Sequence, residues 1–214
     1  MLRKEAVTSG TLELLKELMQ EELLKNFILV GGTALSLLIG HRISIDLDLF
    51  STNPFDEQEL FEYLEQNKNF KLDSLQKNTI KGQIGEIKID LITHAYPFVK
   101  TALLIEGIRM ASLEDIIAMK LNAIAGNGTR LKDFIDIFYL SSLFSLNQMT
   151  EAYSVKYDSR NSFIPLKALA YFNDINFQEP VQMLTGKLPW QSIEKRINEM
   201  INNPDRIFTT DGGN

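Results

Sequence analysis

The feature that most constrains the fold is a segment of alternating apolar and polar side chains. Residues 43–50 place isoleucine or leucine at every second position, with Asp46 and Asp48 between them. A period of two is typical of a β-strand, so both carboxylates are expected on one strand face. Before it, the apolar run 27–30 predicts a buried strand ending at Gly31-Gly32, and residues 33–39 predict a short helix beginning there.

The neighbouring segments extend this α/β pattern. Residues 11–27 carry an amphipathic helical stripe, and residues 56–66 predict a helix with Pro54 in its first turn. Residues 70–80 and 83–93 predict two strands joined at Lys81-Gly82. On the second of these, Asp90 shares a face with Lys88 and Glu86.

After about residue 108 the pattern becomes helical. Ser112 and Asp115 have the spacing of a capping box that opens a helix to about residue 125, and further helices are predicted over 130–146 and 191–201. We therefore expect an α/β (α+β) core with a mixed sheet in residues 1–110. A helical domain in residues 111–214 is expected to pack on this core, with the functional site in the cleft between them.

Composition excludes several classes of protein. With 28 acidic and 22 basic residues, the net charge is −6, which argues against a uniformly basic nucleic-acid binder. Residues 68–100 nevertheless hold six lysines against three acidic residues, so a local basic groove stays open. The absence of cysteine excludes disulfides, thiolate chemistry and zinc–cysteine sites. No signal peptide or membrane-spanning run is recognisable, so a cytoplasmic location without membrane contact is expected.

Three aspartates and a glycine turn make up the chemical signature. Asp46, Asp48 and Asp90 would repel one another at close range unless cations neutralised them, and all-oxygen ligands suit Mg²⁺ or Mn²⁺. Three carboxylates are able to hold two such ions on a phosphate. Gly31 and Gly32 open a helix whose first amides suit a phosphate, and Thr33 adds a hydroxyl donor. Each part alone is common as a turn or a solvated strand face, but the ordered combination indicates phosphoryl or nucleotidyl transfer.

These motifs resemble a known family. The stretches 31–35, 41–50 and 88–90, followed by 108–120 and 130–136, are similar to the AbiEii/AbiGii toxin family of nucleotidyltransferases, in the DNA polymerase β-like superfamily. The resemblance covers roughly residues 27–140. It implies that Gly32 and Thr33 hold the nucleoside triphosphate, and that Asp46 and Asp48 are paired metal ligands.

The resemblance also assigns further residues. Asp90 matches the third metal-binding carboxylate, which can also accept the proton of the attacking hydroxyl. Lys120 matches a C-terminal motif and can reach a β- or γ-phosphate as a point charge. Asp133 and Asp136 match another C-terminal motif and share a helix face, where they orient Lys120 or Arg42, or bind the base or the acceptor.

Each of these side chains also has a structural explanation. Asp133 and Asp136 can complement a helix dipole, and Lys120 can be an ordinary exposed lysine. Arg42 and Ser44 are candidates for phosphate contacts, although Arg42 can equally be a surface or salt-bridge residue. We assign His41 and His94 a structural or solvent-exposed role. Glu86 is an additional carboxylate candidate, ranked below Asp90.

The resulting hypothesis is a metal-dependent nucleotidyltransferase that moves a nucleoside monophosphate from an NTP to an acceptor and releases pyrophosphate. The resemblance implies a toxin paired with a cognate antitoxin, and tRNA as a possible acceptor. One alternative is transfer to a small hydroxylated molecule such as an aminoglycoside. Another is a catalytically inactive nucleotide-binding module, against which the three intact aspartates count.

Overall fold

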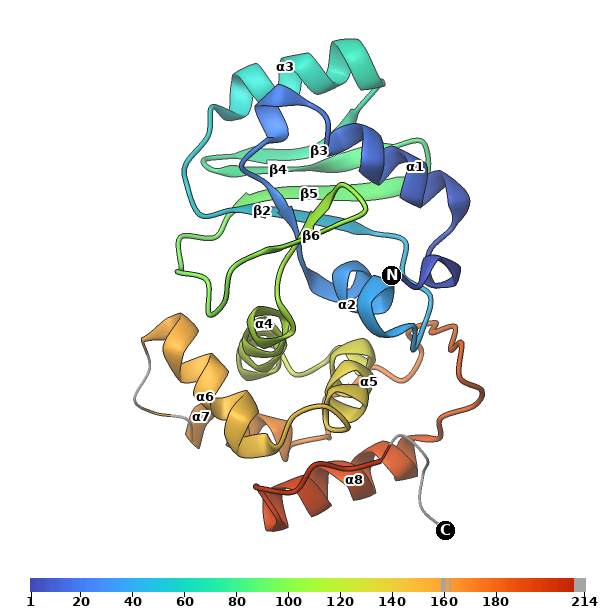
Figure 1. Ribbon diagram of the computed structural model, residues 1–214, viewed down its shortest axis with the longest axis vertical. Coiled ribbons are helices and arrows are strands. Elements are labelled where there is room, and N and C mark those ends of the chain that lie inside the picture. Colours follow the sequence, from blue (N-terminus) through green and yellow to red (C-terminus); the bar gives the residue numbers. More distant parts are fainter. Residues whose placement is uncertain (159–160, 162, 210–214) are drawn as a thin grey trace. The chain divides into compact units, whose positions relative to one another are not determined.

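The computed structural model describes residues 1–158, 161 and 163–209. The chain divides into two compact units, Met1–Ser112 and Leu113–Asn214, close to the boundary expected after residue 110. The first unit contains all the strands, and the second unit is helical in its regular elements (Figure 1).

A seven-stranded mixed sheet forms the centre of the first unit. Its strands are β1 (Ile28–Leu29), β2 (Leu47–Ser51), β3 (Lys71–Gln76), β4 (Thr79–Ile84), β5 (Ile87–Thr93), β6 (Leu103–Ile105) and β7 (Ile108–Met110). They are ordered β3-β4-β5-β2-β1-β7-β6, and the β2–β5 and β1–β7 pairs are parallel while the others are antiparallel. The mixed sheet predicted from the sequence is therefore confirmed.

Two strand boundaries differ from those expected. Lys81-Gly82 lies inside β4 and does not form a turn. The turns lie instead at Asn78, with φ 57°, and at Gly85, with φ 60°, because these residue types tolerate the left-handed conformation that a tight hairpin needs. Gly82 has another role, since a Cβ atom there would collide with the ring of Phe70.

Helices cover parts of this sheet. The first unit contains η1 (Lys4–Ala6), α1 (Ser9–Leu18), η2 (Glu22–Leu24), α2 (Gly31–Ile39) and α3 (Glu57–Lys68). The single helix expected over 11–27 is wrong, because Glu21 is extended and bonds through its carboxylate to Tyr63 and Lys68. Helix α3 begins at its N-cap Asp56, so Pro54 lies before the helix and not in its first turn.

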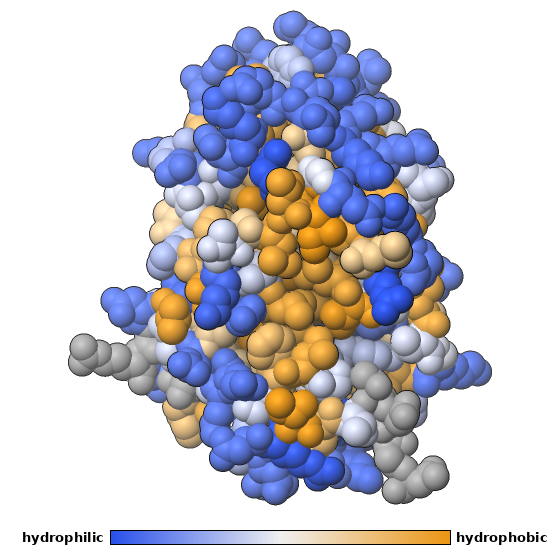
Figure 2. Space-filling view, viewed as in Figure 1, coloured by the Kyte–Doolittle hydropathy of each residue, from blue (hydrophilic) through white to orange (hydrophobic). Residues whose placement is uncertain are grey.

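The core lies on the apolar face of the sheet. Leu47, Leu49, Ile80, Ile89 and Leu91 are buried, and α3 packs against β3 and β4. The edge strand β6 is more exposed, and Figure 2 shows hydrophobic side chains gathered over the β6–β7 hairpin.

The second unit is arranged around α4 (Leu113–Gly126). This helix packs against α5 (Leu131–Leu140), α6 (Leu146–Tyr157) and α7 (Phe163–Leu169), and α8 (Trp190–Asn202) packs on α5. The helix expected over 130–146 ends earlier, at Leu140, and Ser145 and Gln148 form a capping box that starts a further helix, α6. Among the described helices, none combines the length and apolar character that a membrane span requires.

Candidate functional site

The glycine turn lies where β1 leads into α2, as the sequence predicted. Gly31 has φ +70°, and a Cβ atom there would collide with the carboxylate of Asp48. A Cβ atom on Gly32 would likewise collide with the guanidinium of Arg42. The two glycines therefore let one carboxylate and one cationic side chain approach the start of α2. The N-cap residue Val30 makes no side-chain hydrogen bond to the start of α2, and the amides of a helix start suit an anionic group.

Thr33 connects the same turn to the segment before β2 through side-chain hydrogen bonds. Its side chain is buried, donates to the backbone carbonyl of Asp46 and shares a 2.9 Å hydrogen bond with the Ser44 hydroxyl. The hydroxyl is thus engaged with the segment before β2, whereas the sequence suggested a donor for phosphate. Ser44 also donates its backbone N–H to the carbonyl of Ala6.

These bonds correct the strand that was expected over 43–50. Residues 43–46 bond to Thr33 and Ala6 and not to a neighbouring strand, so β2 begins only at Leu47. Asp46 therefore lies just before the strand and is exposed, while Asp48 lies on the strand and is half-buried.

Asp48 and Asp90 are brought side by side by the sheet. The parallel β2–β5 pair places them as direct register partners, so their side chains share one face. The antiparallel β4–β5 pair places Lys81 opposite Asp90, and its Nζ lies 2.7 Å from Asp90 Oδ2. Glu86 lies in the exposed turn before β5, so its expected position on the Asp90 strand is wrong.

The donor set fits a hard cation in chemistry and only partly in geometry. All the candidate ligands are carboxylate oxygens, and two of them are neighbours in register. Within residues 1–158, 161 and 163–209, no three acidic, histidine or cysteine side chains gather closely enough to form a metal site. Asp46, Asp48 and Asp90 thus supply a pair of adjacent carboxylates and a third at the entrance to β2.

Arg42 and the two histidines occupy defined positions. Arg42 is 2% exposed, lies against Gly32 and donates from its guanidinium to the carbonyl of Ile43 at 3.3 Å, so it is not a surface residue. His41 is buried as well. The His94 ring stacks between Phe50 and Tyr96, which agrees with the structural role assigned to it.

The C-terminal candidates form a separate cluster in the second unit. Lys120 Nζ, on α4, lies 2.7 Å from both Asp133 Oδ1 and Asp136 Oδ2 on α5. The three side chains are 7%, 1% and 0% exposed, so Lys120 is not an ordinary exposed lysine. Because an unpaired buried charge is costly, this triad holds α4 to α5 while fixing the lysine amine in place.

One oxygen of this cluster is incompletely satisfied. Asp133 Oδ2 is buried and accepts no hydrogen bond from a described residue, and Arg130 Nε lies 3.8 Å from it. That a cleft joins this cluster to the glycine turn stays a prediction from the sequence.

Among the ion pairs that sequence reasoning missed, two involve residues to which it gave another position or role. Lys81 was placed in a turn, although Thr79, Lys81 and Gln83 have the period of a strand face once the turns at Asn78 and Gly85 are recognised. The second pair joins Lys156 Nζ to Asp115 Oδ1 at 2.8 Å, with both side chains buried, and links α6 to the start of α4. No local pattern signals a pair that lies 41 residues apart in the chain.

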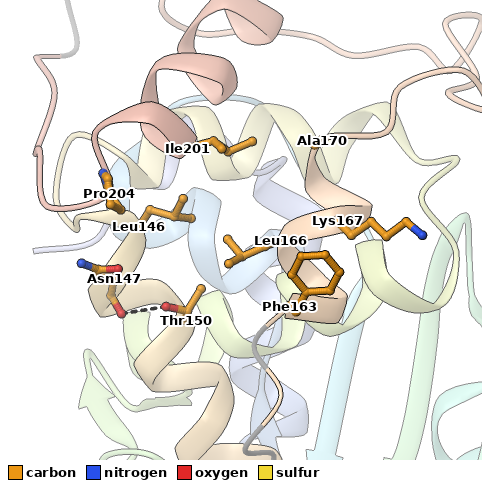
Figure 3. Close-up of a pocket in the computed structure, with 9 residues that line it drawn as sticks. All are labelled: Leu146, Asn147, Thr150, Phe163, Leu166, Lys167, Ala170, Ile201 and Pro204. Atoms are coloured by element: carbon orange, nitrogen blue, oxygen red, sulfur yellow. Dashed lines mark hydrogen bonds between the residues drawn. The ribbon is translucent and has the colours of Figure 1, made fainter.

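The second unit also contains a pocket that is lined by none of the candidate site residues. It measures about 440 Å³, and Figure 3 shows apolar side chains such as Leu146, Leu166 and Ile201 gathered around it, from α6, α7 and α8. Thr150 donates to the carbonyl of Asn147 at its edge, and Lys167 is the one ionisable side chain among the nine lining residues. This lining offers no acid or base pair, so we do not assign the chemistry to it.

Comparison with known proteins connects these features to a family. Residues 13–206 match the family model described as nucleotidyl transferase AbiEii toxin, Type IV TA system. A protein of Aquifex aeolicus (strain VF5), described as uncharacterised, is 30% identical over 168 residues, which cover 76% of this chain and 81% of that protein.

Solved structures share the fold. MenT4, a nucleotidyltransferase toxin from Mycobacterium tuberculosis H37Rv, superposes with a TM-score of 0.59 at 14% identity, covering 93% of this chain and 84% of that one. JHP933 from Helicobacter pylori superposes with a TM-score of 0.53 at 18% identity, covering 93% of each chain. At these identities the likeness concerns the fold.

Proposed function

Because this chain belongs to the AbiEii nucleotidyltransferase toxin family, we propose that it transfers a nucleoside monophosphate from an NTP to tRNA and releases pyrophosphate. The observation that carries the proposal is the placement of the Asp48 and Asp90 carboxylates in direct register, with Asp48 against the glycine turn that starts α2. Nucleotidyl transfer needs an anion-binding turn next to carboxylates, and this unit of the chain provides both.

The proposed nucleotide site begins at the turn. The first amides of α2, at Gly32 and Thr33, hold the triphosphate, and the nearby Arg42 guanidinium adds positive charge. Ser44 and the Thr33 hydroxyl keep the segment before β2 in place. In the second unit, Lys120 is the proposed fixed point charge for a phosphate, and Asp133 and Asp136 position it.

The adjacent carboxylates of Asp48 and Asp90 would hold the divalent cation, Mg²⁺ or Mn²⁺, and Asp46 would join them as the third ligand for up to two ions. The cation would neutralise charge on the triphosphate. In the reaction an acceptor hydroxyl oxygen forms a bond to the α-phosphorus, and the bond between that phosphorus and the bridging oxygen to the β-phosphorus breaks. The hydroxyl proton passes to the Asp90 carboxylate, and pyrophosphate leaves. Lys81, whose Nζ lies 2.7 Å from Asp90 Oδ2, holds that carboxylate in position on β5.

A direct test is incubation of the protein with Mg²⁺, each labelled NTP in turn and total tRNA. Labelled tRNA and equimolar pyrophosphate are expected with at least one NTP. Asp48→Asn should reduce transfer at least 100-fold while leaving the thermal unfolding midpoint close to that of the wild type. The matched control is Asp73→Asn, which removes an exposed carboxylate from β3 and should leave transfer unchanged.

Other outcomes identify the alternatives. Label appearing only in an added aminoglycoside would assign a small hydroxylated acceptor in place of tRNA. Nucleotide binding without pyrophosphate release, across all NTPs and both acceptors, would assign a catalytically inactive nucleotide-binding module. Full transfer by Asp48→Asn would refute the site itself.

The proposal extends to the cellular role. A toxin that consumes NTP and tRNA acts in the cytoplasm, and we propose that a cognate antitoxin restrains it. Induced expression of the wild type should stop bacterial growth, whereas expression of Asp48→Asn at the same level should not. Growth arrest by both proteins would separate toxicity from the transfer reaction.

A further inference from the structure

One face of the sheet in the first unit is polar and carries lysines. Cross-strand register places Ser74, Lys81, Asp90 and Asp48 in one row over β3, β4, β5 and β2 (Figure 1). The next row holds Lys71, Gln83 and Lys88 over β3, β4 and β5. Register thus brings three lysines to the face that presents the two catalytic carboxylates.

The opposite face accounts for this arrangement. Residues adjacent in each strand, such as Ile80, Ile89 and Leu91, are buried, and strand alternation therefore turns the lysines away from the core. Lys71, Lys81 and Lys88 are all exposed, and the Lys81 side chain is 46% exposed although it contacts Asp90.

Neither Lys71 nor Lys88 forms an ion pair with any residue in the described part of the chain. Apart from Asp48 and Asp90, the nearby acidic residues lie elsewhere, since Asp73 is at the β-bulge of β3 and Glu86 is in the turn before β5. Lys71 and Lys88 therefore carry charge without an ion pair on the face that also holds Asp48 and Asp90, in a protein whose net charge is −6.

Protection of an exposed sheet edge explains only part of the pattern. Edge strands commonly carry lysine to prevent pairing with other chains, and Lys71 lies on the edge strand β3. Lys81 and Lys88 lie on the inner strands β4 and β5, where no edge needs protection. The ion pair with Asp90 accounts for one role of Lys81, whereas the position of Lys88 beside the carboxylates requires another reason.

We propose that Lys71, Lys81 and Lys88 bind the phosphate backbone of the single-stranded end of the acceptor RNA and lead it to Asp90. This inference rests on the proposed function, because it is the acceptor hydroxyl that must reach these carboxylates. Neighbouring strands are about 4.8 Å apart and alternate residues about 6.6 Å apart, so Lys88 lies one such step from Asp90 and Lys71 lies two strands further. That reach matches a few nucleotides of an extended strand, and lysine binds phosphates as a point charge without reading sequence.

The test measures RNA binding without NTP. Wild type, the triple variant Lys71→Gln, Lys81→Gln, Lys88→Gln and a control triple variant are titrated with a labelled mixed-sequence single-stranded oligoribonucleotide and with total tRNA, at several salt concentrations. The control replaces three exposed lysines elsewhere, Lys16, Lys25 and Lys195, and so removes the same net charge. Thermal unfolding midpoints verify that all three proteins are folded.

Removal of three contacts to RNA phosphates should reduce the magnitude of the slope of log K for RNA binding against log salt concentration by about 2. Each phosphate contact to a single strand contributes roughly 0.7 to that slope. The control triple variant should keep the wild-type slope. Equal slopes for all three proteins, or equal losses in both triple variants, would overturn the inference. Binding to phosphatidylserine vesicles with the same lysine dependence, and not to RNA, would overturn it in favour of a membrane surface.

A second measurement separates this inference from the proposed function. The double variant Lys71→Gln, Lys88→Gln should raise the KM for tRNA and leave the KM for NTP unchanged. An unchanged KM for tRNA would refute the lysine surface while the transfer reaction stands. If the wild type labels no tRNA yet binds RNA through these lysines, the proposed transfer fails and the surface stands.

Discussion

Replacing Gly31 by alanine tests the central contact of the site. Gly31 has φ +70°, and a Cβ atom there would fall closer to Asp48 Oδ2 than van der Waals contact permits. Two penalties are therefore expected. The left-handed backbone costs an alanine about 1–2 kcal/mol, and the overpacking costs about 1–3 kcal/mol more.

Gly107 provides the matched control for this substitution. Its φ is +82°, and nothing lies within 4 Å of a Cβ atom built there, so Gly107→Ala incurs the backbone penalty without the collision. In urea unfolding, Gly31→Ala should lose about 2–5 kcal/mol and Gly107→Ala about 1–2 kcal/mol, at equal m-values. The difference between the two variants measures the contact between the glycine turn and the carboxylate.

Activity should separate the two variants further. Displacing a reacting group by about 1 Å can cost on the order of 100-fold in rate, so nucleotidyl transfer by Gly31→Ala should fall at least tenfold. Gly107→Ala should retain wild-type transfer at a temperature where it is folded. If both variants lose equal stability and Gly31→Ala keeps full transfer, Asp48 does not depend on this glycine and the reasoning is wrong.

Three further substitutions test charged contacts within each of the two units. Lys120→Met leaves two buried aspartates without their cation and should cost about 3–5 kcal/mol of unfolding free energy, and a loss below about 1 kcal/mol would contradict the buried triad. Arg109→Met removes the donor to three backbone carbonyls, so urea unfolding should show a loss of about 3 kcal/mol, roughly one per hydrogen bond, and no loss would show that water replaces the guanidinium. Glu21→Gln tests a contact that depends on pH. The hydrogen bonds that Lys68 and Tyr63 donate to the Glu21 carboxylate lower its pKa below the ordinary value of 4.5. The stabilisation is therefore present above that value and lost as the pH falls through the lowered pKa, so the stability gap between wild type and variant should narrow in acid, and a constant gap down to about pH 3 would contradict it.

Local patterns predicted much of the first unit. The Gly31 turn lies between a buried strand and a helix because an apolar run, a glycine pair and a second apolar run each have a local preference. Asp48 and Asp90 each lie on a strand because strand alternation is a property of a few adjacent residues. The pattern of the C-terminal part also indicated helices correctly, although it extended α5 past Leu140.

The errors arose where a residue's partners are distant in the chain. Asp46 lies in a segment with strand alternation, but its backbone carbonyl accepts a hydrogen bond from Thr33, and β2 begins only at Leu47. The register that pairs Lys81 with Asp90 depends on the turns at Asn78 and Gly85. A turn placed at another residue changes the strand pairing, so Lys81 would face a different neighbour. The partnership of Lys156 with Asp115 had no sequence signal at all.

The sequence by itself determined the residue types and their local periodicity: a glycine turn, three carboxylates on or beside strands, and a change from mixed to helical structure near residue 110. These follow from steric preferences and alternation, which act over a few residues. Tertiary structure alone decided which of these side chains meet. It placed Asp48 against Gly31 and beside Asp90, paired Lys120 with two buried aspartates and gathered three lysines on one sheet face, because contacts between distant residues are fixed only when strands pair and helices pack.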